Sequence, residues 1–201
     1  MESYILIIGL VLGAYVVASR EQRQRIALLG GHLQSYRIEK LMETLTEGYM
    51  RALGEDSEAR REQILELMQA SEASLSSQFS RFAAEIGALD PEALRVSRLP
   101  WSIPFAGRLF PGVTFDLRKA LEIHARGIAN VVQNADERTP KQRAYVLSAE
   151  MLLMQHTCHW FCKSKTVASA RLIGRHKTTH EQVVAAVSPE TREAYLRLIG
   201  G

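Results

Sequence analysis

The sequence lacks the short motifs by which several enzyme classes are recognised. Its 201 residues contain no P-loop, no dinucleotide-binding fingerprint, no G-x-S-x-G and no H-E-x-x-H. It also lacks internal repeats and any alternation of apolar and polar residues long enough for a sheet. These absences argue against repeat architectures, β folds and the corresponding enzymes. An enzyme with an unrecognised helical active site stays as an alternative, because such sites need no characteristic spacing.

Two further shortages concern charge. Acidic residues are scarce from residue 139 to 180, where Glu150 is the single acid, whereas the region around Glu55 to Glu66 is acidic. The basic residues of the 139–180 stretch are Lys141, Arg143, Lys163, Lys165, Arg171, Arg175 and Lys177. Overall the net charge is +3 and 46% of the residues are hydrophobic, enough to bury one ordinary core with an extended arm beside it.

Charge is absent altogether from Ser3 to Ser19, a run of apolar residues followed by Arg20, Arg23 and Arg25. As a helix this run spans about 26 Å, slightly less than the hydrocarbon layer of a bilayer. A cleaved signal peptide and a buried helix are the alternatives. We favour a transmembrane anchor over 1–19, because the cations follow the run and predict that this side stays in the cytoplasm.

Two features of the N-terminal half suggest self-association. Gly9 and Gly13 form a G-x-x-x-G, which allows close helix approach in lipid, although such pairs are often idle. In the helix expected from Ser57 to Leu89, apolar residues recur seven apart, with Glu72 interrupting one series. The spacing predicts either an antiparallel hairpin or short coiled coil, or an ordinary amphipathic helix. The preceding helix, expected from residue 20 to Gly54, should bend at Gly30–Gly31.

A connecting segment over 90–115 contains prolines that exclude a continuous helix and aromatic residues too apolar for a free linker. Trp101, Phe105 and Phe110 should therefore wrap the core, or else meet a membrane interface or a partner. Beyond it, 116–201 reads as a basic helical domain. Thr139-Pro140 with Gln142 predicts a capped helix start, and shorter helices follow.

Both cysteines and four of the six histidines lie between residues 156 and 180. The spacing Cys158-x3-Cys162-x13-His176-x3-His180 is close to a Cys2His2 zinc pattern. The expected helices do not suit a zinc finger, because a helix runs through both cysteines and another one ends between the histidines. We therefore favour core packing by the cysteines, with the histidines on polar faces or caps and no cofactor; a helical zinc site is the alternative.

The basic residues Lys163, Lys165, Arg171, Arg175 and Lys177 lie within fifteen positions without an acid. They predict a surface for phosphate groups of anionic lipid or nucleic acid, with a solvated helix face as the plain alternative. The sequence as a whole predicts an all-α protein with domains at 1–19, 20–89, 90–115 and 116–201.

From these features we expect a single-pass membrane protein with its N-terminus outside and its body in the cytoplasm, in the inner membrane if the source is bacterial. Its partners would be the lipid bilayer and a membrane or cytoplasmic protein that it recruits or organises, with a homodimer through Gly9/Gly13 or the 57–89 helix as a further option. A membrane-tethered zinc- or nucleic-acid-binding module is the alternative function.

Overall fold

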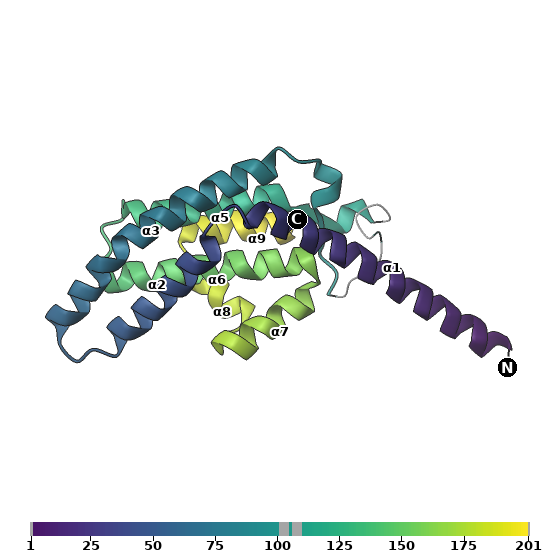
Figure 1. The fold of residues 1–201 in the computed structure, drawn as a ribbon, viewed down its shortest axis with the longest axis horizontal. Helices are drawn as coiled ribbons and strands as arrows, with labels where there is room; N and C mark the ends of the chain where they lie inside the picture. Colours follow the sequence, from purple (N-terminus) through teal and green to yellow (C-terminus); the bar gives the residue numbers. More distant parts are fainter. Residues whose placement is uncertain (1, 101–104, 106–109, 201) are drawn as a thin grey trace.

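The protein is all-α, as the sequence predicts, in a computed structural model that describes residues 2–100, 105 and 110–200. The side chains of residues 2–6, 10 and 11 are not described. The α-helices are α1 (Glu2–Leu33), α2 (Ile38–Leu53), α3 (Glu58–Gly87), α5 (Leu117–Gln133), α6 (Pro140–Cys162), α7 (Lys165–His176), α8 (His180–Ala186) and α9 (Pro189–Gly200). Figure 1 shows them as an elongated bundle from which the N-terminal part of α1 projects.

Helix α1 is continuous from the predicted anchor into the body. Gly30–Gly31 does not interrupt the helix, which continues to Leu33, and the chain turns only at residues 34–37 before α2 begins. Both glycines have open space where a side chain would lie. Their cost to helix stability is limited by their position in the last turn, where few following residues depend on them.

Helices α2 and α3 form the antiparallel hairpin that the heptad-like spacing predicts, and α3 also packs along α5. Ser57 caps α3 by accepting a hydrogen bond from the backbone of Arg60. Glu72, which interrupts the apolar series, is buried between helices: it accepts a hydrogen bond from Tyr49 at 2.6 Å and pairs with Arg143 of α6 at 3.2 Å. A paired carboxylate can therefore occupy an otherwise apolar seam.

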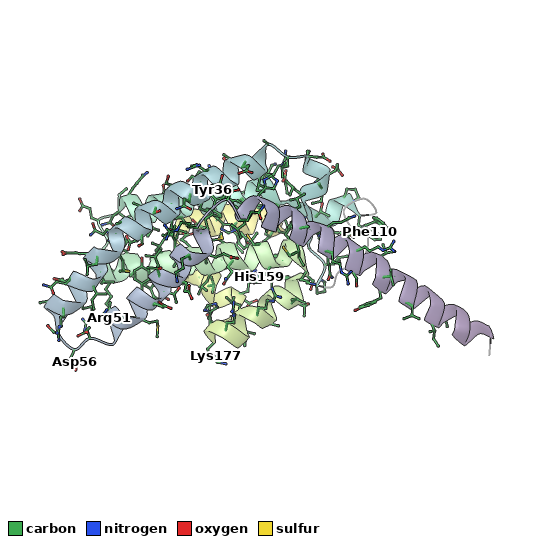
Figure 2. The ribbon with its side chains drawn as sticks, viewed as in Figure 1. Tyr36, Arg51, Asp56, Phe110, His159 and Lys177 are labelled. Atoms are coloured by element: carbon green, nitrogen blue, oxygen red, sulfur yellow. The ribbon has the colours of Figure 1, made fainter. Side chains whose placement is uncertain are left out.

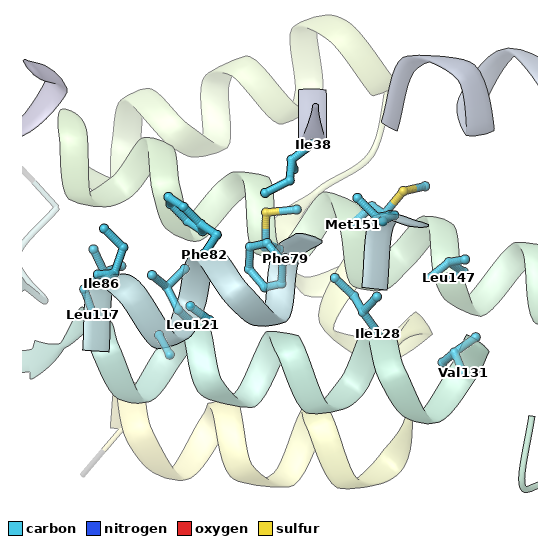
Figure 3. Packing of buried hydrophobic residues seen from close by; sticks show 14 of the residues in the cluster. Ile38, Phe79, Phe82, Ile86, Leu117, Leu121, Ile128, Val131, Leu147 and Met151 are labelled. Atoms are coloured by element: carbon cyan, nitrogen blue, oxygen red, sulfur yellow. The ribbon is translucent and has the colours of Figure 1, made fainter. Parts of the chain in front are cut away.

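The main core lies where α1, α2, α3, α5 and α6 meet. Figure 3 shows side chains of α3, such as Phe79 and Phe82, facing Leu121 of α5 and Met151 of α6. Helices on either side of the connecting segment thus contribute to one core. A second, smaller cluster joins α6 to α7, α8 and α9.

The connecting segment is closed at its ends by a short antiparallel ladder. Strand β1 (Arg95–Ser97), which follows the 3-10 turn η1 (Pro91–Leu94), pairs with β2 (Thr114–Asp116), which follows η2 (Pro111–Val113). These strands could not be predicted, because three residues are too few for a recognisable alternation of apolar and polar side chains.

The aromatic residues of this segment are not all buried, contrary to the expectation that they wrap the core. Phe115 packs on Trp160 with ring centroids 5.0 Å apart. Phe105 and Phe110, in contrast, remain 48% and 49% exposed. Trp101 lies outside the described residues.

Candidate functional site

The outer half of α1, residues 7–16, carries large apolar side chains that are exposed at the positions the structure describes. Ile7, Ile8, Leu12 and Val16 are between 47% and 59% exposed, and Tyr15 is 70% exposed. Exposed apolar side chains in such a row are rare on monomeric proteins and mark contact surfaces. Within the residues that the structure describes, no helix combines the length and the apolar character needed to cross a membrane. Part of the predicted anchor lies outside those residues.

The inner half of α1 is attached to the body at its foot, residues 21–29. Leu29 is buried in the main core. Arg25 donates a hydrogen bond to the carbonyl oxygen of Phe161 and lies over the Phe161 ring, while Glu21 accepts its second hydrogen bond at 2.7 Å. The other carboxylate oxygen of Glu21 accepts a hydrogen bond from the backbone of Phe105. The foot therefore fixes the direction of the projecting half.

The end of α6 meets α1 at the same place. The Lys163 ammonium donates a hydrogen bond to Gln22 at 3.1 Å. Lys163 and Gln22 line an open pocket of about 450 Å³ together with Ala14, Tyr15, Ala18, Ser19 and Arg23. We call this the foot pocket. Sequence reasoning missed it, because it depends on Lys163 and α1 meeting across 141 positions.

The other predicted phosphate-binding cations lie on α7 or at its ends. Lys165 lies over the Trp160 ring at 5.2 Å, and Lys177 caps the end of α7 in a left-handed conformation. Arg171 and Arg175 are exposed one turn apart on α7 and border a recess of about 10 Å³ with His159 and His176. This recess holds at most about one water molecule.

The exposed aromatic residues lie at the end of the body from which α1 projects. Phe105 is bound through its backbone to Glu21 of the foot, and Figure 2 shows Phe110 at the same end. Exposed aromatic residues beside cations are typical of the interfacial zone of a membrane, although they also suit a protein partner.

The predicted zinc ligands are divided between separate surroundings. Cys158 and Cys162 pack against the main core, and burial raises the pKa of their thiols to about 12 and about 11. His176 is exposed at the end of α7, and His180 is buried at the start of α8. Within the described ranges, no three His, Cys, Asp or Glu side chains are grouped so that they could hold a metal ion. The packing of the cysteines against the core agrees with the interpretation that we favoured from the sequence.

A buried cluster of histidines lies between α5, α6, α8 and α9, where we expected polar faces and caps. His156 stacks on His180 with ring centroids 4.4 Å apart, and His180 bonds to the hydroxyl of Tyr195 at 3.2 Å. His124 Nε2 bonds to the hydroxyl of Thr157 at 2.9 Å. The expectation of polar surroundings is wrong for His156 and His180, which are 1% and 7% exposed, because α7 and α8 pack against α6 and Tyr195 of α9 bonds to His180.

Burial determines the protonation of this cluster. It lowers the pKa of His124 to about 3; for His156 burial, aided by the charges of His180 and Lys165, also lowers the pKa to about 3. Both imidazoles are therefore neutral at pH 7. Their side chains act as fixed hydrogen-bonding groups: His124 joins α5 to α6 through Thr157, and His156 joins α6 to α7 through Ser169. Such enclosed rings offer little access to a substrate.

Comparison of the chain with family models, with curated proteins and with solved structures gave no match.

Proposed function

We propose that this chain is a membrane-anchored helical interaction protein, which uses the outer half of α1 to enter a lipid bilayer and holds its body at the cytoplasmic face. The observation that carries the proposal is the exposure of the apolar side chains of residues 7–16 on a helix that projects from the body. Exposed Leu, Ile and Val side chains lose unfavourable contact with water when they enter lipid.

The charges near the foot support one orientation. Arg20 and Arg23 are exposed directly after the apolar half, and Lys163 is added from α6. Basic residues next to a membrane helix favour the cytoplasmic side, where anionic lipids attract them. The half-exposed Phe105 and Phe110 at the same end suit the interfacial zone.

The opposite end of the molecule is the surface that we assign to a recruited protein. Met50, Leu53 and Leu67 of the α2–α3 hairpin are 60–73% exposed. Figure 2 places Arg51 and Asp56 at the tip of this hairpin, at the far end of the long axis from the N-terminus. A body anchored through α1 would hold these side chains away from the bilayer, where a partner can reach them.

The test is flotation of the purified full chain with vesicles of uncharged phosphatidylcholine. We expect the wild-type chain to float and Leu12→Glu to float poorly, because a carboxylate near the centre of an apolar helix costs about 3 kcal/mol in a bilayer. Leu67→Glu introduces the same charge at an exposed leucine of α3 and should leave flotation unchanged. A wild-type chain that stays monodisperse without detergent and does not float would contradict the proposal.

A further inference from the structure

The foot pocket has the composition of a site for an amphiphile with a negatively charged head. Its lining consists of two cations, Arg23 and Lys163, two neutral hydrogen-bonding side chains, Ser19 and Gln22, and the less polar group of Ala14, Tyr15 and Ala18. No acidic residue lines it among those that the structure describes. Two positive charges without a lining carboxylate favour an anionic ligand.

Neighbouring arginines of α1 show why Arg23 is free to bind a ligand. Arg25 is engaged by Glu21, by the Phe161 carbonyl and by the Phe161 ring, so that it serves to attach the helix. Arg23 is exposed and borders the pocket without such a contact among the described residues. Lys163, held toward α1 by its hydrogen bond to Gln22, places a second charge in the same space. Two cations from distant parts of the chain therefore converge on one volume.

Polarity changes along the pocket in the direction that a phospholipid requires. Ala14 and Tyr15 lie on the side of the apolar outer half, and Arg23 lies two turns further toward the body. A phosphate beside Arg23, Lys163 and Ser19 would thus direct its acyl chains along Ala18 and Ala14. Lys, Arg and hydroxyl groups are common phosphate ligands, and alanine leaves room for a chain.

We propose that the foot pocket binds the phosphate of one anionic phospholipid whose acyl chains run along the outer half of α1. This deepens the proposed function and rests on it, because the site is useful only to a chain that lies at a bilayer. The pocket volume of about 450 Å³ accommodates a headgroup and the start of its chains.

The experiment measures binding of short-chain lipids to the full chain in detergent, by calorimetric titration. We expect dioctanoyl phosphatidylglycerol to bind at least about fivefold more tightly than dioctanoyl phosphatidylcholine, the effect of roughly one cation near an anionic group. Glycerol phosphate and inorganic phosphate contain the charge without the chains and should bind more weakly than phosphatidylglycerol. Equal binding by either of them would overturn the assignment to a lipid.

Three variants locate the site. Arg23→Gln and Ala18→Phe should each lower the affinity for phosphatidylglycerol about fivefold, the first by removing a charge and the second by filling the pocket with charge unchanged. Arg20→Gln is the matched control, because it removes one exposed positive charge from the same helix outside the lining. If Arg20→Gln weakens binding as much as Arg23→Gln, or if Ala18→Phe has no effect, the pocket is not the site.

Flotation separates failure of this inference from failure of the proposed function. A chain that floats with phosphatidylcholine vesicles but shows no preference for phosphatidylglycerol in the titration is anchored without a headgroup site, which overturns the inference alone. A chain that does not float contradicts the anchor as well. Circular dichroism of each variant in the same detergent checks that the helices are retained, and a second pocket-filling variant, Ser19→Leu, replaces Ala18→Phe if that one loses helix.

Discussion

The two halves of α1 differ in a way that runs against simple hydrophobic reasoning. The outer half is the more apolar, yet Leu12 is 58% exposed. The inner half carries Arg23, Arg25 and a glycine pair, yet Leu29 is 5% exposed in the main core. Burial in this helix therefore follows the position of the body and not the density of apolar residues. The apolar surplus of the outer half needs another environment, which we propose is lipid.

The largest expected difference is in the free energy of unfolding when one leucine is truncated in each half of α1. Leu29→Ala should lower the free energy of unfolding of the body by about 2 to 4 kcal/mol, because it removes buried methyl groups and leaves a cavity. Leu12→Ala should leave that free energy unchanged, since the side chain contacts no part of the body. Chemical denaturation in mild detergent, followed by circular dichroism, measures both values. Equal losses would show that the halves do not differ in this way.

Mild acid should lower the stability of the body and leave the outer half of α1 unaffected. In the unfolded chain His124 and His156 titrate near the ordinary value of 6.5, whereas their pKa in the fold is about 3. The unfolded state thus binds more protons below pH 6.5, and stability falls as the pH falls. Between pH 6.5 and about 5.5 we expect a loss of about 2 kcal/mol for the two histidines together.

The pH dependence has an internal control. His124→Gln and His156→Gln should each flatten the slope of unfolding free energy against pH, even where they lower stability at pH 7. Flotation through the outer half should not change over this pH range, because residues 7–16 contain no titratable carboxylate or imidazole. An unchanged slope in both variants would mean that other groups cause the acid sensitivity.

A smaller effect distinguishes two arginines of the foot. Arg25→Gln should lower stability by about 1 to 2 kcal/mol, because it removes a charge-assisted hydrogen bond and a contact with the Phe161 ring. Faster amide exchange over residues 21–29 would reveal a loosened foot. Arg23→Gln removes the same charge two positions away and should change neither stability nor exchange. A matching effect of Arg23→Gln would contradict its assignment to a ligand site.

Local signals predicted much of the fold. Ser57 and Thr139 mark helix starts, and each of them caps its helix by accepting a hydrogen bond from the backbone. Glycine was less informative: Gly54 follows the end of α2 as expected, but Gly30–Gly31 ends nothing. Caps act through neighbouring backbone groups and are therefore visible in sequence, whereas the effect of a glycine depends on what packs around it.

The candidate site could be predicted only in part. Lys163 was recognised as a basic surface residue. Its partner Gln22 and the foot pocket could not be predicted, because they depend on a contact between residues 141 positions apart. The burial of His156 and His180 likewise requires α7 and α8 to pack against α6. The spacing of Cys158 and Cys162 is visible in the sequence. It does not reveal that both side chains pack against the main core, because that depends on the neighbouring helices.

Because α1 passes from its outer half into the core as one continuous helix, it is a rigid connection and not a flexible linker. The distance along the helix from Val16 to Leu29 is about 20 Å and cannot be shortened or extended as in a glycine-rich linker. If the outer half lies in a bilayer, the tip of the α2–α3 hairpin is held at a fixed distance from the membrane surface. The body is then confined to a narrow range of distances from that surface. A partner would then be selected by the distance of its binding surface from the membrane as well as by its chemistry.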